Sequence, residues 1–426
     1  MALKNRLKSQ IDSGRVAWHI AALAMATSMV FCFVVYPRIA RRHRAVLDSD
    51  HYGRLGINLA CTGTLTHYSS GSGPTVDRGP GYPFFVAATW LAGGGRYPWC
   101  VQAAQCVLFS LTCLLVFATA RRLWSPRVAA AAALLCALHP LLLWYTSRIW
   151  VETPASFLFV AVVAACVNLH VRASLGRAVL LGLILGVACL FKSTFLPLVV
   201  LGPLGVLWAK DNRVGAALAM ASMVTAAAVI APWTARNAAL TGRFIPVHLV
   251  AGYNFRIGDG MVDHFSEAPF SFEHLWTAGE PERNAVMAKL PGRPKTWQWE
   301  VARDRTFLSD SLTRYARDPA FLAKKAAMNA WWFWTLGQTP RKTTALAVMQ
   351  APLVILFAIS AVMVLRRKGF GSIHAVPIVL VGTYYLAYLP MVACARYSMV
   401  LVATMVMYAV AAFSPRQPTK ETPCRI

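Results

Sequence analysis

Long apolar runs recur along most of this chain, and they constrain its fold more than any other feature. A helix of about 20 apolar residues spans the hydrocarbon core of a bilayer, which is about 30 Å thick. Hydrophobic residues make up 57% of the sequence and charged residues only 14%, whereas soluble domains are about 25% charged. We therefore predict an all-α multi-spanning membrane protein with about ten transmembrane helices. The predicted spans are 17–36, 99–119, 128–146, 153–171, 178–192, 195–209, 214–234, 345–365, 374–393 and 397–413.

The first of these runs, 17–36, follows a basic N-terminal segment and in that respect resembles a signal peptide. It is longer than the apolar core of a signal peptide, and no small-residue cleavage site follows it. We interpret it as a retained first transmembrane helix.

Positive charge is in large excess, with 42 Lys and Arg against 17 Asp and Glu and a formal net charge of +25. In a soluble protein this excess would suggest nucleic-acid binding. In a membrane protein, basic residues gather at the cytoplasmic ends of the helices, so we expect the lipid bilayer, and no nucleic acid, as a partner. Loops rich in Lys and Arg alternate along the chain with loops that contain few of these residues. If the basic loops are cytoplasmic, both the N- and the C-terminus are cytoplasmic, and we predict a location in the plasma (inner) membrane. The exception is a basic cluster outside the first span, at Arg38, Arg41, Arg42 and Arg44.

The acidic residues are distributed in the opposite way. In this topology only Asp12, Asp211 and Glu421 are cytoplasmic, and the other Asp and Glu residues lie outside. Acidic residues contribute little to orientation, so the bias suggests that the functional surface is the periplasmic or extracytoplasmic face.

The distribution of polar segments divides the chain into four parts. We expect an N-terminal transmembrane module at 1–235, with a helical outer loop at 37–98 that contains the chemistry. The polar segment 236–344 is expected to form a small outer-face domain. Further transmembrane helices follow at 345–413, and a cytoplasmic tail at 414–426.

Two features stay open at this point. The amphipathic, Trp-rich segment 321–337 is interpreted as a helix lying in the membrane interface, because Trp favours the headgroup level; the alternative is an additional span. Cys61 and Cys100, in or beside the first outer loop, could form a disulfide, and the sequence does not decide between the paired and the free state.

The first candidate catalytic residue is Asp48, in the pattern Asp48-x-x-x-Tyr52 just outside the first span. We expect Asp48 at or near the start of a short helix, with Tyr52 one turn on and on the same face. A carboxylate between hydrocarbon and water is suited to act as a general base. The alternative is a structural role as a helix N-cap, which Asp fills well.

Four further charged residues, in three segments, lie near predicted outer ends of helices. Asp77 and Arg78 precede a rigid Gly79-Pro80-Gly81 turn, where a charged pair could bind a phosphate or a metal–phosphate ligand or form an ordinary surface ion pair. Glu152 begins the fourth span, where it is either a site residue or compensates the helix dipole. Lys192 ends the fifth span, where it either binds the ligand or extends its amine to the interface.

A last candidate segment runs from Pro232 to Asn254, where a membrane helix leads into the outer domain. It contains Arg236, Tyr253 and Asn254, which together with Tyr52 and Tyr82 are candidate substrate-binding residues. Composition alone would describe this segment as an interfacial anchor.

Taken in order, these motifs resemble the GT-C superfamily of polyprenyl-phosphate-sugar-dependent glycosyltransferases. The resemblance is to the bacterial relatives of protein O-mannosyltransferases and of the transferase that adds aminoarabinose to lipid A. It rests on Asp48-x-x-x-Tyr52, the Arg78 to Pro83 turn, Glu152 before Thr153-Pro154, and the Pro-Trp-x-x-Arg-Asn…Gly…Pro…Gly-Tyr-Asn pattern within 232–254. Many relatives have two prolines where this chain has Gly79-Pro80-Gly81, and a Lys where it has Arg78. The region after 345 matches only in general character.

The resemblance implies a GT-C-like helix bundle and a hexosyl- or pentosyltransferase activity with inversion at the outer face. The donor would be a polyprenyl-phosphate sugar, and the acceptor an envelope glycan, a lipid or a protein. Asp48 would be the catalytic base or acceptor-orienting group. Asp77, Arg78 and Glu152 would lie near the donor phosphate or a metal, and Lys192, which the resemblance does not cover, is a further candidate there. The implied cofactor is a divalent cation, Mg²⁺ or Mn²⁺ bound by Asp77 and Glu152, or else none.

Two other function classes remain as alternatives. A transporter or flippase for polyprenyl-linked glycans would place ionisable residues near the bilayer midplane, and here the span interiors are almost free of charge. An O-antigen ligase or polymerase is a second membrane transferase with an outer-face site. Sugar transfer by the purified protein would separate an enzyme from a flippase.

Overall fold

The structure is a computed structural model that describes residues 2–43, 48, 51–67, 73–207, 212–266, 270–292, 294 and 296–413. All the regular elements in these ranges are helices. The first half contains α1 (Ala2–Val30), the π-helical turn η1 (Phe31–Val35), α2 (Tyr36–His43), α3 (Tyr52–Thr62), α4 (Gly81–Ala92), α5 (Trp99–Leu123), α6 (Pro126–Ala137), α7 (Pro140–Thr146), α8 (Glu152–Val171), α9 (Leu175–Phe191), the 3₁₀ turn η2 (Ser193–Phe195) and α10 (Leu196–Leu207). The second half contains α11 (Asn212–Thr241), α12 (Ala251–Asp263), α13 (Phe272–Ala278), α14 (Glu280–Met287), α15 (Trp297–Arg317), α16 (Pro319–Thr335), α17 (Pro340–Lys368), α18 (Ala375–Leu386) and α19 (Ala395–Ala412).

Six helices in the described ranges are long and apolar enough to cross a membrane: α1 with its extension to Arg41, α5, α8, α11, α17 and α19. The pair α6 and α7, bent by 52°, would make a seventh span, and α9, η2 with α10, and α18 are shorter apolar helices. Each of these ten segments overlaps one of the ten predicted spans, although the last three are shorter than a membrane span. The prediction of an all-α multi-spanning membrane protein is confirmed.

The bundle is built around α8 and α19. In each of them 72% of the most apolar window is buried within the protein, against 22% for α17. α8 and α19 therefore form the centre, and α17 offers most of its surface to the surroundings. Close packing at α9 and α11 depends on a glycine, because a Cβ on Gly182 would lie 2.6 Å from the Cβ of Thr225. Small residues permit this approach in membrane helices.

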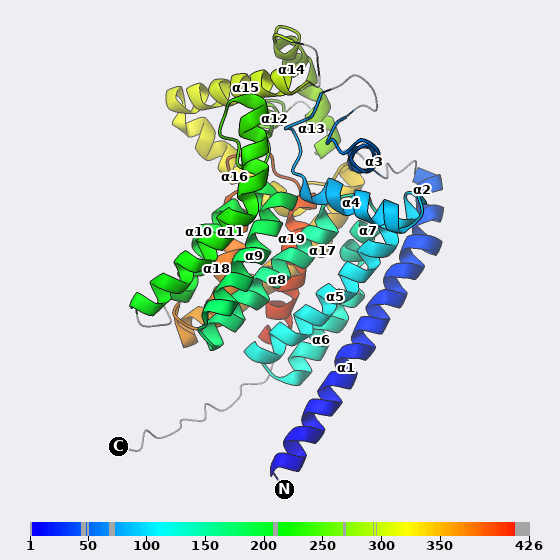
Figure 1. The fold of residues 1–426 in the computed structure, drawn as a ribbon, viewed down its shortest axis with the longest axis vertical. Coiled ribbons are helices and arrows are strands. Elements are labelled where there is room, and N and C mark those ends of the chain that lie inside the picture. The colour runs from blue at the N-terminus through cyan, green and yellow to red at the C-terminus, as the bar shows by residue number, and fades with distance from the viewer. Residues whose placement is uncertain are drawn as a thin grey trace.

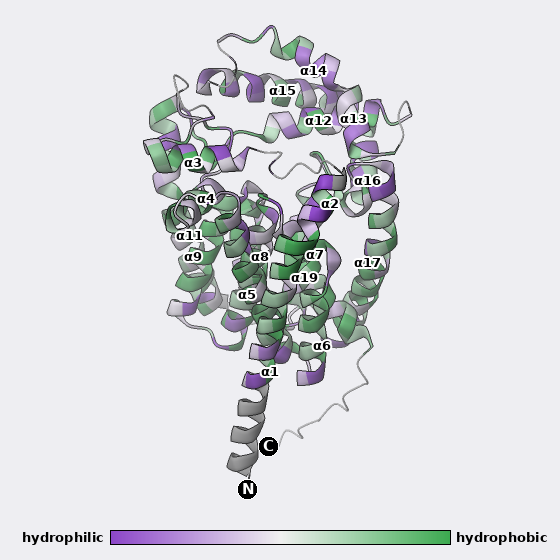
Figure 2. Cartoon of the chain, turned by 90° about the vertical axis from the view of Figure 1, so that its right-hand side faces the viewer, coloured by the Kyte–Doolittle hydropathy of each residue, from purple (hydrophilic) through white to green (hydrophobic). Residues whose placement is uncertain are grey.

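The polar part of the chain forms a cap at one end of the bundle. Figure 1 shows α12 to α15 above the bundle, with α3 and α4 at the same end and the N-terminus at the opposite end. Figure 2 shows hydrophobic residues concentrated in the bundle and hydrophilic ones in the cap. The outer loop and the polar segment, which are far apart in the sequence, are thus neighbours at one end.

The Trp-rich helix α16 connects the cap with the bundle and is not among the candidate spans. It packs against α12, α15, α17 and α19. Its Lys325 is fully buried and lies 2.7 Å from Asp259 Oδ1 of α12 and 2.8 Å from the Tyr315 hydroxyl of α15. This buried ion pair fastens α16 to the cap.

Cys61 and Cys100 are both free thiols.

Candidate active site

Asp48 lies just before helix α3 and closes its first turn. Its Oδ1 accepts a hydrogen bond from the Tyr52 amide (2.9 Å) and its Oδ2 one from the Gly53 amide (2.7 Å). The helix begins at Tyr52, later than expected, because the His51 backbone is left-handed with φ of 59°. Asp48 therefore precedes the helix and does not share a face with Tyr52. Ser49 and Asp50, its neighbours, lie outside the described residues.

Tyr82 connects the region of Asp48 with that of Glu152. Its ring is edge-on to Tyr52 at 4.9 Å, and its hydroxyl donates to Gln105 Oε1 at 2.9 Å. Burial, and then the charges of Asp48 and of Glu152, raise the pKa of the Tyr82 phenol well above its usual value. Both carboxylates are therefore within electrostatic reach of one buried ring, as expected for two parts of one site.

The Gly79-Pro80-Gly81 turn lies on the end of α9. A Cβ on Gly79 would come within 2.7 Å of the Leu190 carbonyl oxygen, and one on Gly81 would overlap the Phe191 ring. Glycine is needed here because the two backbones nearly touch. The turn thereby brings Asp77 and Arg78 close to the end of α9, where Lys192 follows.

Asp77 is buried in a cluster of charges at the junction of the loop and the cap. Arg303 Nη2 of α15 lies 2.8 Å from Asp77 Oδ1, and Arg78 Nη1 lies 3.5 Å from Oδ2. Burial alone would raise the pKa of Asp77, but these two guanidinium groups hold it well below its usual range. Arg303 is itself fixed over the ring of Tyr253 at 4.6 Å.

Glu300, one turn before Arg303 on α15, binds the same loop. It accepts hydrogen bonds from the Thr75 hydroxyl (2.6 Å) and the Val76 amide (2.8 Å). Burial, followed by the charge of Asp77, raises the pKa of Glu300 to about 7. The cap thus fixes the loop through one ionised carboxylate, Asp77, and one that titrates near neutrality, Glu300.

We expect Glu300 to make the protein less stable as the pH rises. Between its ordinary pKa of 4.5 and its folded value of about 7, the folded state keeps a proton that the unfolded state loses. The folded state should therefore lose up to about 3 kcal/mol across this window and no more above it. Thermal unfolding from about pH 4.5 to about pH 8 measures this slope, which Glu300→Gln should flatten. Glu280→Gln, an exposed control, should leave it unchanged; an equally steep slope in the Glu300 variant would contradict the assignment.

Glu152 lies at the start of α8, where its side chain is 1% exposed and paired with two cations. Arg396 Nε of α19 lies 2.8 Å from Glu152 Oε1, and Lys192 Nζ lies 3.4 Å from the same oxygen. The sequence predicts Glu152 and Lys192 as site residues, and the structure brings them together. Lys192 is also 4.9 Å from the centre of the Tyr397 ring.

Arg148 adds a further positive charge beside this pair. It is 2% exposed, and its guanidinium lies over one face of Trp150 at 4.1 Å, while that of Arg396 is 4.0 Å from the same ring. In the part of the chain that the structure describes, no carboxylate pairs with Arg148, and Arg148 Nε and Trp150 Nε1 are buried without a hydrogen-bond acceptor. Burial lowers the pKa of Arg148. The group therefore has buried hydrogen-bond donors and positive charge suited to an anion.

Most of the candidate substrate-binding residues have side chains that pack against other parts of the protein. Tyr52 and Tyr82 are buried. Arg236 Nη1 donates to the Thr75 carbonyl at 2.9 Å and its guanidinium stacks on Trp233. Tyr253 stacks on Arg303, and Asn254 follows it on α12. In this state Arg236 and Tyr253 support the loop and the cap around Asp77.

Three potential metal ligands in the described ranges lie together at this junction: His67, Asp77 and Glu300. His67 Nε2 is 3.9 Å from Asp77 Oδ2 and 3.7 Å from Glu300 Oε1. Adjacent ligands about 2.1 Å from an octahedral ion such as Mg²⁺ are roughly 3.0 Å apart, so these atoms would have to move closer together by a little under about 1 Å to bind one. This group contains Asp77 but not Glu152, the other predicted ligand, which belongs to the cluster with Lys192 and Arg396.

The sequence motifs do not single out five residues that the structure brings to this candidate site: His67, Arg148, Glu300, Arg303 and Arg396. Arg148 and Arg396 were visible as rare cations in short outer loops. Glu300 and Arg303 were hidden in a cap helix with many charges, 224 and 226 positions from their loop partners Val76 and Asp77. No local pattern marks such a pair.

Part of the chain is similar to a known protein family. Residues 77–235 match the dolichyl-phosphate-mannose-protein mannosyltransferase family, a range that contains Asp77, Arg78, Glu152 and Lys192. No curated protein sequence is significantly similar to the chain.

Among solved structures, the fold is similar to an archaeal oligosaccharyltransferase, AglB from Archaeoglobus fulgidus. The complex with an inhibitory peptide and a dolichol-phosphate is 13% identical, with a TM-score of 0.55, and the similarity covers 93% of this chain and 50% of that one. The apo form is 14% identical, with a TM-score of 0.57 and a coverage of 92% and 50%. This chain thus spans about half the length of the oligosaccharyltransferase. ArnT from Cupriavidus metallidurans bound to undecaprenyl phosphate is 15% identical over 92% of this chain and 77% of that one, with a TM-score of 0.42, too low to support an argument. The chain therefore has a GT-C fold, and the match over residues 77–235 confirms the GT-C resemblance that its sequence motifs indicate.

Proposed function

We propose that this protein is a membrane glycosyltransferase that moves a sugar from a polyprenyl-phosphate donor to an envelope glycan, lipid or protein at the outer face. One observation supports this more than any other. Arg148 and Arg396 lie against the Trp150 ring, and Glu152 is the carboxylate paired with both Arg396 and Lys192. Buried positive charge of this kind is favourable once an anion binds, and the donor phosphate is such an anion.

The chemistry follows as a single displacement. The acceptor oxygen attacks the anomeric carbon, the bond between that carbon and the phosphate oxygen breaks, and the polyprenyl phosphate leaves with the electron pair. Asp48 accepts the hydrogen bond of the acceptor hydroxyl and takes its proton. Lys192, Arg148 and Arg396, together with Arg78, stabilise the charge that develops on the leaving phosphate. One displacement inverts the anomeric centre, for a hexose or a pentose alike.

The proposed arrangement places the outer loop 37–98 and the polar segment 236–344, which contains the cap, at the extracytoplasmic face of the plasma membrane. Both termini are then cytoplasmic. The end of the bundle opposite the cap carries Arg121 and Arg122 at the end of α5 and Arg366 to Lys368 at the end of α17. Cytoplasmic loops are rich in such residues, which supports this orientation.

A divalent cation would be held by His67, Asp77 and Glu300. It would supply positive charge to a phosphate oxygen. In its absence Arg78 and Arg303 neutralise Asp77. Loss of sugar transfer after chelation, with recovery on adding Mg²⁺ or Mn²⁺, would support the metal, and unchanged activity would exclude it.

The function is tested with the purified protein in liposomes that contain labelled polyprenyl-phosphate sugar. We expect the label to appear on an added envelope extract, or in free sugar if water replaces the acceptor. Label that crosses the bilayer with its bond to phosphate intact would instead identify a flippase. Absence of both transfer and hydrolysis with a range of hexose and pentose donors would contradict the proposal.

A further inference from the structure

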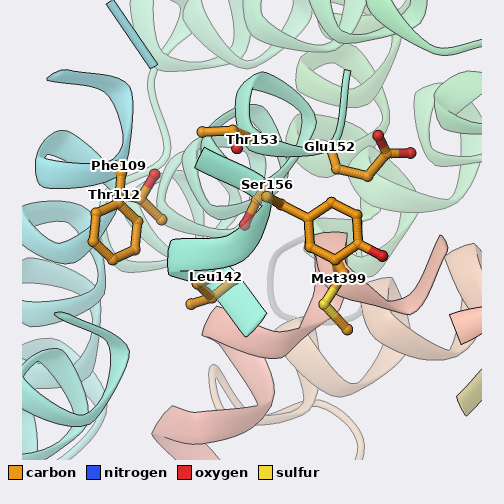
Figure 3. A pocket seen from close by; sticks show the side chains of 8 residues that line it. Phe109, Thr112, Leu142, Glu152, Thr153, Ser156 and Met399 are labelled. Atoms are coloured by element: carbon orange, nitrogen blue, oxygen red, sulfur yellow. The ribbon is translucent and has the colours of Figure 1, made fainter. Parts of the chain in front are cut away.

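A small cavity inside the bundle has Glu152 in its wall, together with both apolar and hydroxyl-bearing side chains. Figure 3 shows it lined by Glu152, Thr153 and Ser156 of α8, with Thr112 and Phe109 of α5 and with Leu142 and Met399. Three oxygen atoms here are buried without a hydrogen-bond partner: Glu152 Oε2, Thr153 Oγ1 and Ser156 Oγ. All three side chains are at least nine-tenths buried.

Unpartnered buried oxygens are costly, at about 1–3 kcal/mol each. The cavity has a volume of about 10 Å³. Measured in the same way, one water molecule needs roughly 10–15 Å³. A buried water typically makes about three hydrogen bonds to such groups. The number of unpartnered atoms and the space both correspond to a single water molecule.

We propose that this cavity binds one structural water molecule and that Thr153 and Ser156 are positioning residues, which act through that water on Glu152. The inference rests on the proposed function, because it describes how the phosphate-binding cations are held. The water donates one hydrogen bond to Glu152 Oε2 and exchanges two more with the hydroxyls of Thr153 and Ser156. One carboxylate oxygen of Glu152 is thereby fixed, while the other receives Arg396 and Lys192.

A cation would fit this cavity less well than water. Lys192 and Arg396 already neutralise Glu152, and further positive charge beside them would be repelled. A water molecule adds no charge and satisfies hydroxyls and carboxylate together. Without it, the carboxylate can rotate away from the two cations, which would then be misplaced for the donor phosphate.

The test compares two Thr→Val substitutions in the same cavity. Thr153→Val removes one of the unpartnered hydroxyls. Thr112→Val is the matched control, because the Thr112 hydroxyl already donates to the Leu108 carbonyl at 2.8 Å. We expect the dissociation constant for undecaprenyl phosphate to rise about tenfold or more in Thr153→Val and to stay within about twofold of wild type in Thr112→Val. Equal constants in the two variants would overturn the inference.

Two further measurements separate this role from a merely structural one. If Thr153 acts only through Glu152, its substitution should have no additional effect in a Glu152→Gln background; an undiminished effect would show an independent role. If Thr153→Val does not fold, Ser156→Ala serves in its place, with the same expected loss.

An experimental high-resolution structure should show one solvent peak within about 3.2 Å of Glu152 Oε2, and a dry cavity would refute the proposal. Wild-type protein that fails to bind undecaprenyl phosphate, but shows this peak, would contradict the proposed function and leave the water site standing.

Discussion

Replacing Asp48 by Asn should reduce sugar transfer by about 10²–10⁴-fold while leaving the protein folded. The size of the loss is that of removing a general acid–base group. The fold should survive because Asn caps a helix about as well as Asp, and the Asn amide oxygen still accepts the hydrogen bond from the Tyr52 or the Gly53 amide. The measurements are the transfer rate from a labelled polyprenyl-phosphate sugar and the thermal unfolding temperature.

This substitution separates the two interpretations that the sequence leaves open for Asp48. The structure shows that Asp48 does close the first turn of α3, so a capping role is real. If capping were its only role, Asp48→Asn would keep nearly full activity and Asp48→Ala would lose stability. Asp310→Asn, on the exposed face of α15, is the control for removing one acidic group and should be neutral.

Most of the fold could be predicted from the sequence because a bilayer imposes a length on every apolar helix. The run 153–171 corresponds to α8 (Glu152–Val171) within one residue. The start of α3 was placed too early, because the left-handed backbone at His51 follows from the way Asp48 turns back on the Tyr52 and Gly53 amides. No periodicity contains that information.

The site was predictable only where its residues lie near each other in the sequence or at the end of a span. Asp77 and Arg78 are adjacent, and Glu152 and Lys192 mark helix ends on the same side. The contacts that fix Asp77 come instead from Arg303, in a cap helix 226 positions away. The proximity of Asp77 and Arg303 depends on how the cap folds back over the loop, which is a tertiary property.

Arg148 offers the sharpest distinction between a structural and a functional charge. It is as buried as Arg283, at 2% exposed, but Arg283 donates to the Trp276 carbonyl at 2.6 Å. Arg148 instead shares the Trp150 ring with a second guanidinium, that of Arg396. The two guanidinium groups repel each other in the free protein, and a bound anion would relieve this repulsion. Such an arrangement is expected of a binding site, where function and stability have opposite requirements.

Arg148→Met should therefore raise the unfolding temperature and weaken the binding of undecaprenyl phosphate. The thioether chain keeps the packing on Trp144 and Trp150, while a buried positive charge that no described carboxylate pairs with is removed. Loss of a charge-assisted hydrogen bond, about 1.5–3 kcal/mol, should raise the dissociation constant roughly 10- to 150-fold. Arg303→Met is the matched contrast: it leaves Asp77 buried without its closest cation, so the unfolding temperature should fall. A fall in the unfolding temperature of both variants would show that Arg148 stabilises the fold. If Arg148 is kept for its ligand, replacing it should instead make the free protein more stable.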